Sequence, residues 1–408
     1  MGIDKQNIKY FIGTTDKDPL KYKCGETVTF TVKAYEQQNG TKVPFVCPML
    51  KYILKKDNCN YTVEDTLECI DGTLTVKCTL DVPGFCYLNV FMCNEYGEIM
   101  QDCESFSGAA GADVHKIGQA LEDPSDFDEF WAEKLSELRN IPVTVTQKVP
   151  REPVNDVSFV WDVKVTSIGV MPSSFLIAIP KDTLHGKKYP IHLSFSAYGV
   201  SDISTPSGKS SIDIIANPHG IMNGQSPEYY EAMGRVCKNF GFDKKQNESP
   251  ETCYFKNMLL RDVQTLRYAM TLPEWDGNTI ISHGGSMGAM RATALAALCN
   301  EYVTALEIAI PWHCDLGGPL KGRVRGWRPE LSNGIRYFDT ASFAKRLKCP
   351  VTVYAGLGDT VCRAVSECVL FNNIRSPKKI TFSQGNDHGY QMREEESHTY
   401  DENWNNIK

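Results

Sequence analysis

Residues 278–288 read NTIISHGGSMG, and this stretch decides the fold. A short β-branched run leads into Gly284-Gly285-Ser286-Met287-Gly288, a G-x-S-x-G pattern, and an alanine-rich helical segment follows at 289–298. Strand, sharp turn, serine and helix in this order form a nucleophile elbow, which points the serine hydroxyl out of the sheet. Glycine at 284 and 288 avoids the collisions that side chains would cause there. We predict that Ser286 is a nucleophile; the alternative is a chance match of the pattern.

The composition excludes several classes of protein. The 408 residues are 42% hydrophobic and 23% charged, as in ordinary globular proteins, and leave room for two domains. A formal net charge of −7 argues against a nucleic-acid partner. No apolar run approaches the ~18 residues of a membrane-spanning helix, so we expect no membrane partner. The N-terminal stretch MGIDKQNIKYFIG has no signal-peptide core, which predicts a cytoplasmic protein, with a processed secreted form as the alternative.

The 15 cysteines are scattered as single residues, without a C-x-x-C pair. A zinc ribbon or thioredoxin motif is therefore not expected. Reduced, mostly buried thiols are the simplest interpretation, and disulfides among the eight cysteines of the N-terminal region are the alternative.

Two domains are predicted. Residues 1–104 contain short alternating runs, at 27–32 and 74–80, separated by Gly- and Asn-rich turns, which indicates a small immunoglobulin-like β-sandwich. We find no catalytic constellation in it and expect an accessory role. Residues 105–408 are the expected catalytic domain, opening with a linker at 105–125.

The pattern after the linker is that of an α/β protein. A helix is predicted from a capping box of Ser125 and Asp128, with one apolar face made by Phe127, Phe130, Trp131, Leu135 and Leu138. Strands then dominate from residue 143, and helices and strands alternate after residue 226. This order predicts the α/β-hydrolase fold, a mostly parallel sheet with helices on both faces.

A serine nucleophile needs a base, and in this fold the base follows the acid late in the chain. Three histidines follow Ser286. His388 lies in a loop just past the last predicted strand, where the base is expected. His313 comes too early but could line the pocket, and His398 lies in a polar segment that favours solvent exposure.

The base needs an orienting carboxylate. Asp359 follows the strand 351–355 and the turn Gly356-Leu357-Gly358, which can present the carboxylate at the sheet edge. Asp387 is the rival, although neighbours on a strand-end loop usually point apart, and Asp315 is on an earlier loop. An oxyanion hole needs two donors. The N–H of Met287 is the first, and the second is expected in the loop 196–199 without a residue being specified.

Several segments together resemble the acetyl xylan esterase and cephalosporin C deacetylase family of α/β-hydrolases. The similar segments cover about residues 106–395 and include DFDEFWAEKLSEL, ANPHGI, PEYYEAM, CYFKNMLLRDVQTL, PEWDGNTI, PWHCDL, IRYFDTASFAKRLKCPVTVYAGLGDTVC and the HGY loop. The resemblance implies the triad Ser286, Asp359 and His388, and it implies the N–H of Tyr198 as the second oxyanion donor. The sandwich is not part of the basic family unit and resembles the extra domain of longer bacterial members.

This chain departs from the family at four places. Met287 replaces a glutamine, the loop 195–198 reads F-S-A-Y in place of F-H-G-Y, and Cys362-Arg363-Ala364 and His388-Gly389 replace Cys-Pro-Pro and His-Glu. The first two changes concern the acyl pocket rather than the serine chemistry.

The resemblance predicts a serine esterase that releases small acyl groups, chiefly acetate, from acetylated xylo-oligosaccharides or related plant glycans, without metal or cofactor. Trp312 and Tyr198 are candidate sugar platforms, and His313 a candidate pocket residue. A homo-oligomer is expected from the family, although the added domain could block its contacts. The alternatives are a feruloyl or other larger-acyl esterase, a peptidase of the same fold, and a non-catalytic carbohydrate-binding protein.

Overall fold

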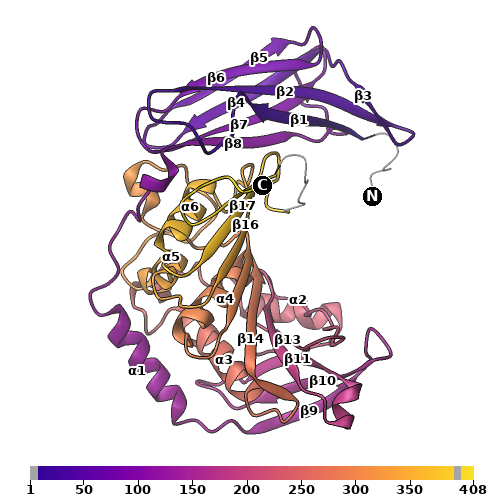
Figure 1. Ribbon diagram of the computed structural model, residues 1–408, viewed down its shortest axis with the longest axis vertical. Coiled ribbons are helices and arrows are strands. Elements are labelled where there is room, and N and C mark those ends of the chain that lie inside the picture. Colours follow the sequence, from indigo (N-terminus) through magenta and orange to yellow (C-terminus); the bar gives the residue numbers. More distant parts are fainter. Residues whose placement is uncertain (1–7, 390–396) are drawn as a thin grey trace.

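The structure is a computed structural model that describes residues 8–389 and 397–408. A small β part is stacked on one end of a larger α/β part (Figure 1). The N-terminal stretch 1–7, Tyr390 and the residues up to 396 lie outside the described residues. In the described ranges, no helix is both long enough and apolar enough to cross a membrane.

The β part is a sandwich of two four-stranded antiparallel sheets. One sheet contains β1 (Lys9–Thr15), β2 (Thr27–Gln38), β3 (Thr41–Pro44) and β6 (Thr73–Thr79), and the other contains β5 (Thr62–Glu68), β4 (Met49–Lys56), β7 (Gly84–Cys93) and β8 (Phe106–Ala112). Their inward side chains share one core, to which Phe30, Val76 and Leu88 contribute. Strand β8 corrects the predicted boundary, because residues 106–112 were expected to be linker. Their composition, FSGAAGA, lacks the β-branched residues that signal a strand.

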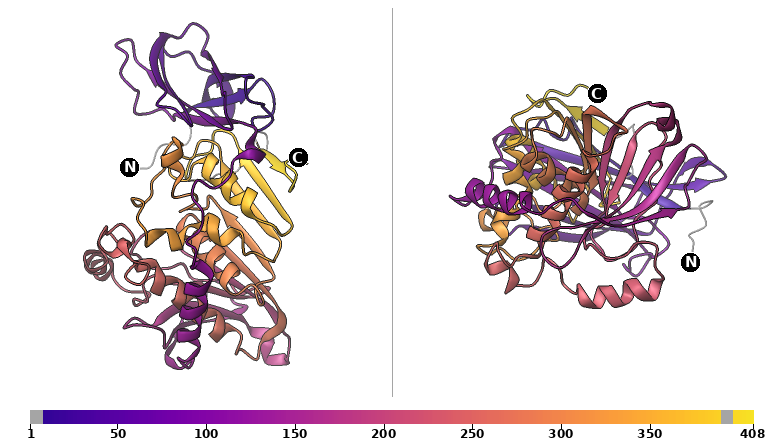
Figure 2. Two further views of the ribbon diagram at one scale, coloured as in Figure 1. Left: turned by 90° about the vertical axis from the view of Figure 1, so that its left-hand side faces the viewer. Right: turned by 90° about the horizontal axis from the view of Figure 1, so that it is seen from below.

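The rest of the predicted linker is tied to the α/β part over its whole length (Figure 2). The turn η1 (Val114–Lys116) follows β8 directly. The N–H of Ala120 then donates to Asp315, and Asp123 forms ion pairs with Lys345 and Arg346. The segment is therefore a strap on the surface of the domain rather than a flexible connection.

The α/β part is built on a ten-stranded sheet with the strand order β18-β17-β16-β15-β14-β12-β13-β11-β10-β9. The strands are β9 (Val145–Arg151), β10 (Ser158–Val165), β11 (Ser173–Pro180), β12 (Tyr189–Phe195), β13 (Ile212–Ala216), β14 (Trp275–Gly285), β15 (Ala305–Ala309), β16 (Val351–Gly356), β17 (Lys378–Ser383) and β18 (Ser397–Tyr400). Pairing is parallel from β13 through β12 to β17 and antiparallel at both ends. Parallel strands place their carboxyl ends at one edge, where sites of this fold are built.

The α-helices are α1 (Phe127–Arg139), α2 (Pro227–Val236), α3 (Tyr254–Ala269), α4 (Met287–Leu298), α5 (Thr340–Ala344) and α6 (Ala364–Asn373). Short 3-10 turns are η2 (Lys181–His185), η3 (Gln246–Glu248), η4 (Gly318–Lys321) and η5 (Ile335–Phe338). Helix α1 presents its predicted apolar face, and the indole N–H of Trp131 donates to the carbonyl of Tyr337. The predicted capping box is absent there, because the N-cap residue is Asp126, whose side chain makes no bond to the helix backbone, and Asp128 pairs with Arg346.

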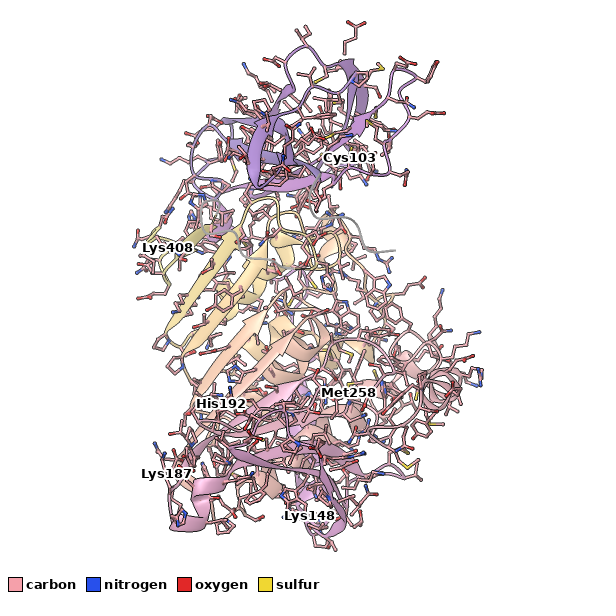
Figure 3. The ribbon with its side chains drawn as sticks, turned by 90° about the vertical axis from the view of Figure 1, so that its right-hand side faces the viewer. Cys103, Lys148, Lys187, His192, Met258 and Lys408 are labelled. Atoms are coloured by element: carbon pink, nitrogen blue, oxygen red, sulfur yellow. The ribbon has the colours of Figure 1, made fainter. Side chains whose placement is uncertain are left out.

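Helices α3, α4, α5 and α6 contact one another in sequence and form one layer against the sheet. Along the central strands, buried and partly exposed residues alternate, and the buried ones, such as Ile191 and Leu193, face this layer. The other face carries partly exposed side chains, among them His192, which Figure 3 labels on strands that no helix covers in that view. We expected helices on both faces; among the described residues, one helical layer covers these central strands, on the face of Ile191 and Leu193.

Candidate active site

The elbow holds Ser286 in a strained conformation between β14 and α4, with φ of 55° and ψ of −121°. Such a backbone persists only where its surroundings fix it. The N–H of Ser286 donates to the carbonyl of Ala309 at 3.0 Å, and its carbonyl accepts the N–H of Trp312 at 3.2 Å. Both glycines are needed, since a Cβ on Gly284 would overlap the backbone of Gly288, and a Cβ on Gly288 would overlap the carbonyl oxygen of Phe195.

Three side chains that are far apart in sequence form one hydrogen-bond chain. The Oγ of Ser286 lies 3.0 Å from Nε2 of His388, and Nδ1 of His388 lies 2.9 Å from Oδ2 of Asp359. An N–H at Nδ1 donates to the carboxylate, which leaves the lone pair of Nε2 to accept the serine O–H. The side chain of Asp359 is 0% exposed and that of His388 is 34% exposed, so the acid is shielded from water while the base can be reached.

The carboxylate of Asp359 is oriented by the backbone that follows it. Its Oδ1 accepts the N–H groups of Val361 at 2.7 Å and Cys362 at 2.8 Å, which leaves Oδ2 for the imidazole. The hydrogen bond to Asp359 raises the pKa of His388 above its ordinary value, against the opposing effect of burial. This geometry therefore favours the imidazolium that forms when His388 takes a proton.

The rival acids and bases have other partners. Asp315 is ion-paired with Arg323, and Asp387 is exposed and accepts the N–H of Gly389. His398 lies on β18 opposite Phe382, with Nδ1 4.0 Å from Asp18. Of the candidates, the structure brings only Asp359 and His388 to Ser286 among the described residues.

The two predicted oxyanion donors lie on segments that meet at the elbow. Met287 is the first residue of α4, and the N–H groups of a first helical turn have no acceptor within the helix. The carbonyl of Phe195 packs against Gly288, which places the loop that begins there and carries Tyr198 beside the elbow. The two N–H groups as oxyanion donors remain predictions.

The predicted pocket residues Trp312 and His313 need correcting. Trp312 is 1% exposed, and its indole N–H donates to the carbonyl of Trp327 at 2.7 Å. His313 is also buried, and its Nδ1–H donates to the carbonyl of Phe338 at 2.7 Å. Burial lowers the pKa of His313 to about 3 and keeps the ring neutral. Neither side chain offers a surface on which a sugar ring could stack.

Sequence reasoning missed Trp327, which is 43% exposed. Its ring centroid lies 4.8 Å from that of Tyr198 and 4.7 Å from that of Phe242. The backbone N–H of Trp327 donates to the carbonyl of Val361, two residues after Asp359. Trp327 thus lies between the loop that carries Tyr198 and the loop that carries Asp359. It belongs to the irregular stretch GRVRGWR, where neither periodicity nor a motif marks it.

A groove of about 1010 Å³ opens beside Tyr198. Its walls come from the loop after β12 and from helix α2, and it ends at Phe240, which stacks on Tyr198 with ring centroids 4.1 Å apart. Polar side chains such as Gln225 and Asn239 line it together with Tyr230. The groove therefore combines aromatic surface with hydrogen-bonding groups, as sugar-binding sites do.

One set of residues in the described ranges has ligand atoms close enough for a metal ion, namely Asp359, Cys362 and His388, within 4.8 Å of one another. Asp359 and His388 are already bonded to each other in the serine chain. A metal there would replace that bond rather than support it.

Comparisons with known proteins show the family and the fold of this chain. The sequence profile of the acetyl xylan esterase (AXE1) family matches residues 112–318 and 326–404. The acetyl esterase Axe7A of Xylanibacter ruminicola is 26% identical over 327 residues, 76% of this chain and 72% of that protein.

Two solved structures show the same fold. The acetyl xylan esterase from Paenibacillus sp. R4 has a TM-score of 0.57 at 17% identity, over 68% of this chain and 94% of its own. Acetyl xylan esterase 1 from Thermoanaerobacterium sp. JW/SL YS485 has a TM-score of 0.55 at 20% identity, over 69% of this chain and 93% of its own. The neighbours confirm the predicted α/β-hydrolase fold, and the profile covers more than half of the chain. The chain therefore belongs to the acetyl xylan esterase family of carboxylic ester hydrolases.

Proposed function

We propose that this protein is a serine esterase that removes acetyl groups from acetylated xylo-oligosaccharides or related plant glycans through an acyl-enzyme. The observation that carries the proposal is the chain from Ser286 Oγ through His388 to the buried Asp359, with contacts of 3.0 and 2.9 Å. A serine hydroxyl is a weak nucleophile unless an adjacent base takes its proton, and this base is held and oriented by a third group.

In the proposed acylation, Nε2 of His388 takes the proton of Ser286 as Oγ bonds to the ester carbonyl carbon. Asp359 keeps the other ring nitrogen protonated and stabilises the imidazolium. The carbonyl oxygen becomes an oxyanion, which the N–H groups of Met287 and Tyr198 bind in the proposal. When the tetrahedral intermediate collapses, the bond to the sugar oxygen breaks and His388 donates its proton to that oxygen.

Deacylation repeats these steps with water. His388 takes a proton from the water as its oxygen bonds to the acyl carbon, and returns it to Ser286 Oγ as acetate leaves. Every proton transfer uses the same nitrogen, Nε2, which is the ring atom that faces Ser286. The raised pKa of His388 supports this role, because the imidazolium must form in each half-reaction.

The groove beside Tyr198 supports a glycan as the alcohol part of the substrate. A cavity of about 1010 Å³ is larger than an acetyl group needs and offers both aromatic and amide side chains. The same space favours a second candidate, an esterase for feruloyl or other large acyl groups. The two differ in whether the sugar or the acyl group occupies the groove.

The test compares p-nitrophenyl acetate, its longer-chain and aromatic homologues, acetylated xylo-oligosaccharides, methyl ferulate and a peptide amide. We expect acetate release from the acetylated substrates, little turnover of ferulate and none of the peptide. A fluorophosphonate probe should label wild-type protein and not Ser286→Ala. Faster turnover of methyl ferulate than of the acetylated substrates would replace the acetyl assignment with a feruloyl one. Cleavage of the peptide amide would indicate a peptidase. Folded protein that neither labels nor turns over would favour a non-catalytic carbohydrate-binding protein.

A further inference from the structure

The edge strand of the sandwich bonds to the segment that carries the base. Strand β8 pairs with β7 along one side, and on its other side the N–H of Gly111 donates to the carbonyl of Pro19 and a single bridge joins Ala112 to Tyr22. The side chain of Gln384 fills the place of a next strand, because its Oε1 accepts the N–H of Ala109 at 3.0 Å and its Nε2 donates to the carbonyl of Ala109 at 3.0 Å. Gln384 is 4% exposed, so both bonds are shielded from water. A buried amide that lost both partners would be costly.

Gln384 directly follows β17 and precedes His388 by four residues. The loops of the base and the acid are themselves joined. The N–H of Gly358 donates to the carbonyl of Asn386 at 2.9 Å, and the N–H of Leu357 donates to that of Ser383 at 3.0 Å. A displacement of the segment after β17 would therefore move the residue next to Asp359 as well.

Strand β8 also touches the acid loop directly. A Cβ on Gly358 would overlap the carbonyl oxygen of Ser107, which is two residues before Ala109 in β8. A Cβ on Gly108 would meet Oε1 of Gln384. The backbone of β8 is thus in contact with both loops, and it lies beside the ends of β16 and β17 in Figure 1.

The base loop borders open space on the side that faces the sandwich. A cavity of about 420 Å³ lies between the two, lined by Ser105, Phe106, Asn386, Asp387 and Gly389 among others. A loop that borders open space is held by its anchoring bonds rather than by close packing. The pair of bonds to Ala109 is the anchor next to this cavity.

We infer that the N-terminal sandwich is a working part of the active site, and that Gln384 is a positioning residue which holds the loops of His388 and Asp359 against β8. The inference rests on the proposed function of these two residues. It gives the added domain a role that differs from substrate binding, since its contact is with the catalytic loops themselves. Because the reaction depends on the 3.0 and 2.9 Å contacts of His388, a shift of about 1 Å would slow it strongly.

The test uses two variants of matched shape. Gln384→Met keeps the size of the side chain and removes both hydrogen bonds. Asn372→Leu is the control, because Nδ2 of Asn372 also donates to backbone carbonyls of the segment that leaves the sandwich, those of Val114 and Ile117, both at 2.9 Å. Asn372 is in α6 and takes no part in the hydrogen-bond chain of Ser286, His388 and Asp359. Both variants are expected to unfold at lower temperature than wild type.

Only Gln384→Met should change the chemistry. We expect its kcat for p-nitrophenyl acetate to fall about tenfold to a hundredfold while KM stays within about twofold. We also expect the pKa of His388, measured by NMR on its Cε1–H signal and assigned with His388→Gln, to fall toward that of a free imidazole. Asn372→Leu should leave kcat and this pKa as in wild type. Gln384→Glu keeps the acceptor for the N–H of Ala109, so its kcat should lie between those of wild type and Gln384→Met. If Gln384→Met does not fold, Gln384→Glu takes its place in the test.

An unchanged kcat and an unchanged pKa of His388 in folded Gln384→Met would overturn the inference and leave Gln384 as a stabilising contact only. The NMR measurement separates this outcome from a failure of the proposed function. If wild-type protein turned over no ester, the esterase proposal would fall, whereas the pKa of His388 would still report whether Gln384 positions the loop.

Discussion

Asp359 contacts His388 through a single carboxylate oxygen, because the N–H groups of Val361 and Cys362 occupy the other. The acid is thus oriented by its own loop before it meets the base. This arrangement determines what happens when the carboxylate is replaced.

We expect Asp359→Asn to lower kcat by about 10³–10⁴-fold with little change in folding. The two backbone N–H groups would hold the amide oxygen in the place of Oδ1 and turn the NH₂ group toward Nδ1 of His388. The imidazole would then need its proton on Nε2, where it could not accept from Ser286. Steady-state kinetics and the rate of fluorophosphonate labelling measure the effect. A variant with more than a tenth of wild-type kcat would contradict this role of Asp359.

The acid limb of the pH profile should report His388. Its pKa is raised, chiefly by the hydrogen bond to Asp359, so the ring becomes protonated and inactive at a higher pH than an ordinary histidine, about 6.5. We expect kcat/KM to fall as the pH decreases, with a midpoint above that value. For stability the sign is the opposite, since the charged pair stabilises the fold at low pH and this contribution is lost as the pH rises through the folded pKa. A midpoint of the acid limb below pH 6 would contradict the assignment of this limb to His388.

The elbow glycines offer a matched pair of substitutions. Gly288→Ala would drive a Cβ into the carbonyl oxygen of Phe195, so it should abolish activity and lower stability by about 1–3 kcal/mol. Gly285→Ala meets nothing within 4 Å and should fold as wild type does. Thermal unfolding and fluorophosphonate labelling compare the two. Equal stability of both variants would show that the close approach of β12 to the elbow is not as described.

His313 should make the protein sensitive to acid. Its folded pKa of about 3 lies far below the ordinary value of about 6.5, so only the unfolded chain binds a proton between these values. Stability is therefore lost as the pH falls, by about 2 kcal/mol from pH 7 to pH 5. His313→Asn can keep the bond to the carbonyl of Phe338 and tolerates the positive φ of 68° at this position. Urea unfolding at several pH values should show a flatter dependence for this variant, and an equal slope would contradict the prediction.

Trp327 should matter for sugars and not for small esters. If its exposed indole is the platform beside the proposed oxyanion loop, Trp327→Ala should raise KM for acetylated xylo-oligosaccharides by about tenfold and leave p-nitrophenyl acetate nearly unchanged. The small ester is the internal control for damage to the triad. Equal losses on both substrates would mean that Trp327 supports the fold of the site instead of binding sugar.

Local signals predicted the elbow and its partners well. The run from Thr279 to Leu298 contains its own strand, turn and helix signals, and the structure has β14, Ser286 and α4 there. Asp359 and His388 follow strands of the same parallel sheet, so the order of elements alone places them near one edge. The structure brings both to Ser286.

Other features depend on contacts between distant segments. Strand β8 has the composition of a linker and is a strand because β7 supplies its hydrogen bonds. Trp312 and Trp327 cannot be told apart by residue type, yet Trp312 is buried and Trp327 is exposed. The loop between them folds back, so that the carbonyl of Trp327 accepts the indole N–H of Trp312. The capping box was wrong for the same reason, since Asp128 bonds to Arg346.

The amino-acid order alone thus specifies which residues can react, because turn geometry, strand ends and chain order are encoded in short stretches. It does not specify how firmly those residues are held. That depends on the bond between Gln384 and Ala109, 275 positions apart, and on the carbonyl of Phe195 against Gly288. Such contacts arise when the sheet and the sandwich close on each other, and no short stretch of sequence contains both partners.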